Sequence, residues 1–486
     1  MSLLKNSLKI FLCISILISC QNEELLFENA ICIQNINTID PSDGLKKNQT
    51  VIIKNGKIHK IVATDSLNLS GKNTIVDGTG KYLIPGLWDA HVHFAYIEEM
   101  APSMFDLFLT HGITSVRDTG GKVDFVKGWK DKALANPTDA PRVMMAGPLL
   151  DGEPNVYDGS DAAHPELSVG LATVEDVTSQ IEMLVSKNVD LLKAYEMLTP
   201  EQFEQIMALA KKNRLKVTGH VPLSMDAITA SNLGLNSIEH MRNLEISCAS
   251  NAEELWEQRK KLLKNEKNLT GGELRSSIHT AQREIAIANY DEERANKVLA
   301  TLKKNDTWQI PTQALNTFFT RKYFARNDWQ ESYALLPDTI GQDWLDNSKA
   351  LANAETPKAK EAWNQWNYMM VKKIHDTGIP IMAGTDTPIA FLTPGLSLHE
   401  ELAVLVEDVG LSTLDALKAA TINPAKYFSL HNELGSVKEN MWADLVILDA
   451  NPLENIKNTT KIYAVIKQGK LHDKDMLNAR IQKLKN

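Results

Sequence analysis

The chain contains Pro85-Gly-Leu-Trp-Asp-Ala-His91-Val-His93, a short apolar run that ends in two histidines one residue apart. Its length and composition predict a buried β-strand. Because side chains alternate along a strand, His91 and His93 point to the same face. In a barrel that face can be the interior, where two imidazoles can bind a divalent metal. The alternative is a pair of unrelated histidines.

The segments that follow this strand alternate between strand-like and helical texture. Short β-rich runs occur at residues 112–117, 142–146, 190–193, 216–219 and 380–384, and amphipathic segments such as 199–211 and 397–406 separate several of them. This alternation predicts βαβ units and a parallel sheet. We therefore expect an α/β fold in which residues 86–429 form a (β/α)8 TIM barrel.

One part of this region has a different composition. Residues from 250 onward are rich in Lys, Glu, Asn and Ala, which predicts a helical insertion at about 250–345 that extends from a barrel loop. Trp308-Gln-Ile-Pro-Thr312 is predicted to supply the barrel strand after the insertion.

Both ends of the chain have all-β texture. Residues 27–85 contain short strands with turn signals such as Asn55-Gly56, and residues 430–475 repeat this pattern. We expect residues 27–85 plus 430–475 to form one small β-sandwich.

Composition excludes several classes of protein. The chain has 486 residues, of which 43% are hydrophobic and 23% charged, as in globular proteins. Disorder, collagen and a multi-span membrane protein are excluded. With 52 Lys and Arg against 61 Asp and Glu, the net charge is −9, so no nucleic-acid partner is expected.

The first residues are typical of an export signal. Lys5 and Lys9 precede an apolar run at 10–18 that is too short to span a bilayer, which predicts a signal peptide at residues 1–19. Leu17-Ile18-Ser19-Cys20 resembles a bacterial lipobox, which implies a lipidated Cys20, a tether at 20–26, and a membrane-anchored protein in the periplasm or outer membrane. The alternative is an ordinary signal peptide. Cys32 and Cys248 are expected to be buried rather than bridged.

A lysine stands on another predicted strand, Val189-Asp-Leu-Leu-Lys193-Ala-Tyr195. Lysine is rarely buried without a partner, and burial lowers the pKa of its amine. A neutral amine can add carbon dioxide and become a carbamate that bridges two metals. The alternative is a lysine that points outward toward a helix.

Three more polar residues end β-like runs. His220 follows Val217-Thr-Gly, His240 follows Asn236-Ser-Ile-Glu, and Asp386 lies in Met382-Ala-Gly-Thr-Asp386-Thr-Pro388. Each histidine alone could be a polar core residue, and Asp386 could be a helix N-cap. The complete order HxH, Lys, His, His, Asp on separate strand ends is far more specific.

With these residues the chain resembles the amidohydrolase superfamily, and within it the imidazolonepropionase-like and prolidase-like members, over about residues 27–475. The resemblance implies a site with two divalent metals, most often Zn²⁺. His91, His93 and Asp386 would bind one metal and His220 and His240 the other, with carboxylated Lys193 (N6-carboxylysine) as the bridge. A metal-bridging hydroxide would attack the substrate, and Asp386 would act as general base and then general acid.

The chain also departs from that pattern. Mononuclear relatives lack the bridging lysine, so Lys193 argues against imidazolonepropionase activity. Prolidase-like relatives often carry a tyrosine just after the third histidine, where this chain has Val221-Pro222. Tyr195 and His164 are candidates for that substrate-binding role. Arg117 is a candidate for recognising a substrate carboxylate, with a structural ion pair as its alternative.

Three functions remain open. The leading hypothesis is a lipid-anchored hydrolase of an amide bond in a small molecule, such as a dipeptide or an N-acyl amino acid. The first alternative is a mononuclear hydrolase or deaminase of cyclic amides or amidines. The second is a non-catalytic binding lipoprotein, against which the intact ligand set argues. The sequence does not predict the oligomeric state.

Overall fold

The structure is a computed structural model that describes residues 23–64 and 67–485. Cys20 and the predicted signal peptide lie outside the described residues. Within the described ranges, none of the helices combines the length and the apolar character that crossing a bilayer requires. Cys32 and Cys248 are buried and free, as expected.

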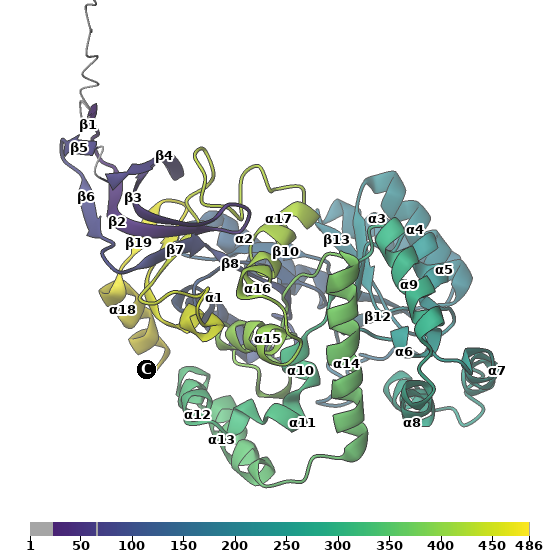
Figure 1. Ribbon diagram of the computed structural model, residues 1–486. Helices are drawn as coiled ribbons and strands as arrows, with labels where there is room; N and C mark the ends of the chain where they lie inside the picture. The colour runs from purple at the N-terminus through teal and green to yellow at the C-terminus, as the bar shows by residue number, and fades with distance from the viewer. Residues whose placement is uncertain (1–22, 65–66, 486) are drawn as a thin grey trace, which may run out of the picture.

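Strands from both ends of the chain form one mixed sheet. They are β2 (Ile31–Asp40), β3 (Gly44–Lys54), β4 (Lys57–Ala63), β6 (Thr74–Asp77), β7 (Tyr82–Pro85), β17 (Leu445–Leu448), β18 (Ile462–Lys467) and β19 (Lys470–His472). The strand order is β19-β18-β17-β7-β2-β3-β4, and β6 pairs with β2. In Figure 1 the C-terminal strand β19 lies near β2 and β7 of the N-terminal part. A separate two-stranded sheet joins β1 (Glu23–Leu26) to β5 (Leu67–Ser70).

The predicted β-sandwich is not confirmed, because the paired strands of both chain ends lie in one sheet among the described residues. The reason lies in β17, which is buried on both faces. Leu445 and Ile447 pack into the core of the end sheet, whereas Val446 and Leu448 pack into the core of the central region. The central region therefore covers the face that a second sheet would cover in a sandwich.

The central region is built on parallel strands. One sheet has the order β10 (Arg142–Met145), β9 (Ile113–Asp118), β8 (Leu87–Val92). The other has the order β12 (Ser168–Leu171), β11 (Leu149–Gly152), β13 (Leu191–Ala194), β14 (Lys216–Gly219), β15 (Ser237–Glu239), β16 (Trp308–Ile310). The strand predicted at Trp308 is therefore present.

Residues 380–387 lie between β16 and β8 but do not form the predicted strand. Met382 N donates to Gln309 O at 2.9 Å, and Ala90 N donates to Ala383 O at 2.9 Å. Pro380 has no N–H to donate, and Asp386 takes a left-handed φ of 69°, so the ladder is interrupted. A second break lies between β10 and β11, because β10 pairs with β9 whereas β11 pairs with β12 and β13. The expected barrel ladder is therefore divided into two parallel sheets.

Helices flank these strands. They are α1 (Ala101–Thr110), α2 (Val123–Ala135), α3 (Val174–Ser186), α4 (Pro200–Asn213), α5 (Ala227–Asn232), α6 (Leu244–Ser247), α9 (Glu292–Lys304), α14 (Lys358–Thr377), α15 (Leu396–Glu407), α16 (Thr413–Ala419), α17 (Ile422–Tyr427) and α18 (Lys474–Leu484).

The predicted insertion is helical but not continuous. Before β16 it contains α7 (Ala252–Leu262), α8 (Gly271–Ala288) and α9, and after β16 it contains α10 (Gln313–Asn316), α11 (Phe318–Arg321), α12 (Asn327–Ser332) and α13 (Asp338–Ala352). In Figure 1 these two groups lie apart, with α14 between them. The pairing of β16 with β15 places a strand of the central region between the two groups.

Candidate metal centre and substrate pocket

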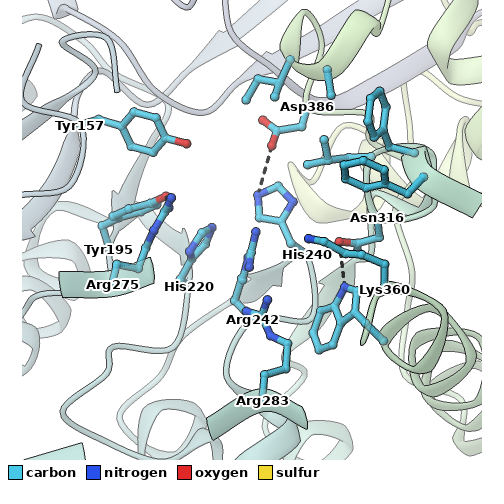
Figure 2. Close-up of a pocket in the computed structure, with 16 residues that line it drawn as sticks. Tyr157, Tyr195, His220, His240, Arg242, Arg275, Arg283, Asn316, Lys360 and Asp386 are labelled. Atoms are coloured by element: carbon cyan, nitrogen blue, oxygen red, sulfur yellow. Dashed lines mark hydrogen bonds and ion pairs between the residues drawn. The ribbon is translucent and has the colours of Figure 1, made fainter. Parts of the chain in front are cut away.

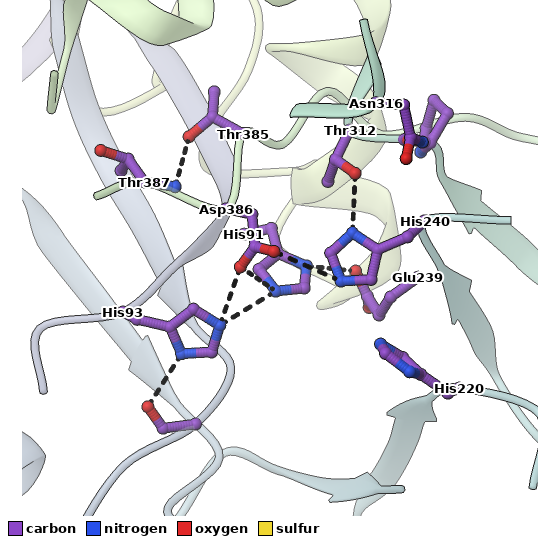
Figure 3. Close-up of polar contacts among 12 residues, drawn as sticks. His91, His93, His220, Glu239, His240, Thr312, Asn316, Thr385, Asp386 and Thr387 are labelled. Carbon is purple, nitrogen blue, oxygen red and sulfur yellow. Dashed lines mark hydrogen bonds and ion pairs between the residues drawn. The ribbon is translucent and has the colours of Figure 1, made fainter. Parts of the chain in front are cut away.

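His91 and His93 lie at the carboxyl end of β8 and face each other through their Nε2 atoms, which are 3.2 Å apart. Each ring is held by its other nitrogen. His91 Nδ1 hydrogen-bonds Glu239 Oε2 at 2.6 Å, and His93 Nδ1 donates to Gly120 O at 2.9 Å. These bonds turn both Nε2 atoms toward the interior of the site (Figure 3).

The histidines that follow β14 and β15 are held in the same way. His220 Nδ1 hydrogen-bonds Glu196 Oε1 at 2.6 Å, and His240 Nδ1 hydrogen-bonds Thr312 Oγ1 at 2.7 Å. The buried Nε2 of His220 has no hydrogen-bond partner among the described residues. Burial lowers the pKa of His220 to about 3, so its imidazole is neutral at physiological pH.

Asp386 joins this group from the loop after residue 380. Its Oδ1 lies 3.1 Å from His91 Nε2 and 3.0 Å from His93 Nε2, and its Oδ2 lies 3.6 Å from His240 Nε2. Burial alone would raise the pKa of the Asp386 carboxyl, but His91 and His240 outweigh it and hold that pKa well below its usual range. Asp386 is therefore a carboxylate that faces three imidazoles.

Lys193 is buried beside this group on β13, with 1% of its surface exposed. Burial lowers the pKa of its amine to about 8, while Glu239 and Asp386 act in the opposite direction. The amine borders a cavity of about 20 Å³ that the four histidines and Asp386 also line. A cavity of this size holds about one water-sized group.

The donor set fits a divalent metal. Ligand atoms of His91, His93 and Asp386 all lie within 4.8 Å of one another. In all four histidines Nδ1 is bound to the protein, which is how metal-binding imidazoles are fixed in one tautomer and orientation. Neutral imidazoles and a carboxylate suit zinc. The unpartnered Nε2 of His220 also needs a ligand to offset the cost of its burial.

A larger cavity of about 310 Å³ opens from these residues (Figure 2). His220, His240 and Asp386 line one end of it, beside Tyr195. Its other walls come from the helical excursion and from α14. The residues that line those walls include Arg275 and Arg283 of α8, Leu315 and Asn316 of α10, Phe318 and Phe319 of α11, and Lys360 and Trp363 of α14.

A sequence profile of the Amidohydrolase family matches residues 82–268 and 334–472, more than half of the chain. The chain belongs to the Amidohydrolase family. This membership indicates a metal-dependent hydrolase that acts on carbon–nitrogen bonds, in agreement with the possible metal site. The family resemblance inferred from the strand-end residues is thereby confirmed.

Individual relatives are distant. Ochratoxinase of Aspergillus niger is 24% identical over 425 residues, which span 77% of this chain and 72% of that protein. A solved Xaa-Pro dipeptidase with bound methionine has a TM-score of 0.64 at 17% identity, covering 92% of this chain and 100% of that chain. Bottromycin amidohydrolase has a TM-score of 0.67 at 18% identity, covering 93% and 90%. These structures share the fold, which implies a TIM-barrel domain in this chain.

Two residues that sequence analysis assigned to the substrate do not line the pocket of this amidohydrolase. Arg117 is fully buried and donates from Nη2 to Glu239 Oε1 at 2.7 Å, which is the structural ion pair named as its alternative. His164 Nδ1 lies 3.1 Å from Asp161 Oδ1 and lines neither cavity. Tyr195 does line both cavities, and its ring lies 4.4 Å from that of His220.

The sequence analysis missed the two carboxylates that hold the histidines in place: Glu239 hydrogen-bonds His91, and Glu196 hydrogen-bonds His220. Glu239 directly precedes His240, and Glu196 directly follows Tyr195, so both could have been suspected as carboxylates at strand ends. It also missed that α8 contributes to the site, although Arg275, His279 and Arg283 recur every four residues and therefore share one face of that helix. His279 Nε2 hydrogen-bonds Glu196 Oε2 at 2.7 Å, so α8 reaches the metal centre through Glu196.

Proposed function

We propose that this amidohydrolase cleaves the amide bond of a small molecule, a dipeptide or an N-acyl amino acid, in a reaction that uses two divalent metals. The observation that carries the proposal is the convergence of four Nδ1-anchored imidazoles with Asp386 at the end of a cavity of about 310 Å³. The likeness to dipeptidase and ochratoxinase folds supports the choice of an amide substrate.

The residues present fit two ions in the following way. His91, His93 and Asp386 would hold one ion, and His220 and His240 the other. The neutral Lys193 amine would add carbon dioxide at Nζ and release a proton, and the resulting carbamate would supply further anionic oxygens to the cavity that Lys193 borders. Zinc bound there would polarise the substrate carbonyl and make hydroxide available near neutral pH.

The protein's own groups carry the proton transfer. Asp386 is placed to accept the proton that the attacking water loses and to return it to the amide nitrogen as the C–N bond breaks. The products are then a carboxylic acid and an amine. Tyr195 Oη accepts a hydrogen bond from Arg275 Nη1 at 3.0 Å, which keeps this phenol at the pocket wall, where it can orient the substrate.

Metal content and Lys193→Ala test the mechanism together. We expect about two metals per chain in protein purified with bicarbonate, and we expect Lys193→Ala to lose both amide hydrolysis and one metal. Asp386→Asn should also stop hydrolysis, whereas a protein that only binds its ligand would keep that binding. Full activity in Lys193→Ala would contradict the carbamate.

A second candidate is a one-metal hydrolase or deaminase of cyclic amides or amidines. The tighter grouping of His91, His93 and Asp386 favours it, because these three residues alone make a compact site. This candidate predicts about one metal per chain and an active Lys193→Ala variant.

We also propose that the protein is exported and anchored in the periplasm or outer membrane through a lipid on Cys20. The lipobox-like Leu17-Ile18-Ser19-Cys20 supports this. Two or three acyl chains give stable attachment. Cys20→Ala should move the protein from the membrane fraction to the soluble fraction, and retention in the membrane fraction would contradict the anchor.

For domain organisation we propose that residues 27–85 plus 430–475 form one unit and residues 86–429 the catalytic unit, with an insertion at about 250–345. The sheet shared by both chain ends supports this division. Limited trypsin digestion should cut first at the exposed Lys264 and Lys267 between α7 and α8, because loop tips are cleaved most easily. Resistance of both sites to trypsin would contradict an insertion whose tip is exposed there.

A further inference from the structure

Four cationic side chains line the pocket, and three of them lie on one wall, whereas Arg275 donates to Tyr195. Arg242 comes from the loop after β15, Arg283 from α8 and Lys360 from the first turns of α14. Figure 2 shows Arg242 and Arg283 on the far side of His240 from Asp386, with Lys360 beside them. Residues distant in sequence thus bring positive charge to one wall.

The carboxylates of the protein do not balance this wall. Glu245 Oε1 accepts a long hydrogen bond of 3.4 Å from Arg283 Nε, and Glu196 is already engaged by two histidines. Arg242 Nε and Arg283 Nη2 are buried without a hydrogen-bond partner among the described residues. Burying guanidinium donors without partners costs free energy, and an anion that binds at this wall would accept hydrogen bonds from them.

The cations also destabilise one another. Burial lowers the pKa of Arg283 to about 10, and the charge of Arg242 contributes to this shift. Burial likewise lowers the pKa of Lys360, with contributions from Arg283 and Arg242. A bound anion would offset this repulsion, and guanidinium groups match carboxylates in geometry.

Beside the charges the wall is aromatic. The guanidinium of Arg283 lies 4.3 Å from the centre of the Trp363 ring, and Phe318 and Phe319 line the same cavity. Stacking keeps Arg283 in a fixed orientation, which favours a planar carboxylate over a diffuse cloud of counter-ions.

Resting on the proposed amide hydrolysis, we infer that the substrate is a dipeptide or an N-acyl amino acid whose leaving amino acid is acidic. Among the described residues, Glu245 is the one carboxylate that is hydrogen-bonded to this wall, so donors of Arg242, Arg283 and Lys360 remain for the carboxylates of a substrate. An aspartate or glutamate leaving group supplies two carboxylates, its α-carboxylate and its side chain, to Arg242, Arg283 and Lys360.

Isosteric substrates test this inference. We expect kcat/KM for Ala-Glu to exceed that for Ala-Gln by roughly tenfold or more, the worth of one charge-assisted hydrogen bond. Lys360→Met and Arg242→Met should each reduce this preference. Lys358→Met is the matched control, because Lys358 lies on the same helix but, unlike Lys360, does not line the pocket. Equal or faster cleavage of Ala-Gln would overturn the inference.

A binding measurement separates this inference from the proposed function. Glutarate should raise the Tm of the holoprotein and of Lys358→Met, whereas glutaramide should not, and the rise should shrink in Lys360→Met. If neither dipeptide is cleaved but this pattern holds, the proposed function fails and the anion site stands. A glutarate effect that is absent, or equal in Lys360→Met and Lys358→Met, would overturn the anion site.

Discussion

Glu196 joins two histidines that lie on different elements. Its carboxylate accepts hydrogen bonds from His220 Nδ1 and His279 Nε2, and both imidazoles hold its pKa well below the usual range although burial opposes them. At the scale of single residues, each histidine of the site is therefore held by a hydrogen bond at Nδ1, which leaves its Nε2 to face the candidate metal site.

Glu196→Gln should weaken metal binding. The amide keeps the shape of the side chain but accepts less strongly from His220, and loss of such a partner costs about 10–100-fold in metal affinity. Chelator competition measures this affinity directly. Glu201→Gln, at an exposed position on α4, is the matched control, and equal affinity in both variants would show that Glu196 does not orient His220.

His399 on α15 shows how burial alone couples stability to pH. Burial lowers its pKa to about 3, and the neighbouring His111 contributes. The unfolded chain takes up this proton near its ordinary pKa of about 6.5, whereas the folded chain does not until about 3. The contribution to stability is therefore present above pH 6.5 and declines as the pH falls toward 3.

His399→Gln should flatten this decline. The free energy of unfolding, measured by denaturant titration at several pH values between 4 and 7, should depend less on pH in the variant than in the parent protein. An unchanged slope would mean that His399 titrates alike in both states.

At the scale of elements, α8 is the helix that links the excursion to the metal centre. It begins at Gly271, whose backbone lies so close to residues 154–155 that an added Cβ would lie 2.2 Å from Asn155 O. Backbone atoms cannot move aside cheaply, so the glycine is needed for this contact. The position of Arg275, His279 and Arg283 depends on it.

Gly271→Ala should displace α8 and cost about 1–3 kcal/mol of stability, as overpacking does. Hydrogen exchange should increase in α8, and amide hydrolysis should fall. Gly128→Ala in α2 is the control, because nothing lies within 4 Å of its added Cβ, so it should stabilise by about 0.5–1 kcal/mol. Unchanged exchange in α8 would show that the close approach is relieved elsewhere.

At the scale of the whole molecule, β17 connects two cores. Because its alternate residues pack to opposite sides, the end sheet and the central region share one strand. We expect both to unfold in a single transition.

Ile447→Ala should destabilise this shared transition by about 2–5 kcal/mol, because it leaves a cavity in the core of the end sheet. Ile75→Ala, at a position that is 52% exposed, should change stability by about 0.5 kcal/mol or less. Scanning calorimetry measures both. Two separate transitions in Ile447→Ala would show that the regions unfold independently.

Much of the architecture could be read from local patterns. The strands around His91, Lys193 and His220 are short segments with a polar side chain at or near the carboxyl end, and period-two alternation decides which way a side chain on a strand faces. The segment at 380–384 was read as a strand on the same grounds. There Pro380 and the left-handed Asp386 interrupt the hydrogen-bond ladder. Whether such a segment is still a strand depends on how many hydrogen bonds the neighbouring strands make with it.

The sequence by itself determined the family and the chemical types at the centre, because those residues lie on strand ends whose direction is set locally. Only the tertiary structure decided what surrounds them. Arg117 forms an ion pair with Glu239 and does not line the pocket. Arg242, Arg283 and Lys360 line one wall of the pocket together. The reason is physical: side-chain direction along a strand follows from the backbone repeat, whereas contacts between a loop and two helices depend on how their packed faces dock.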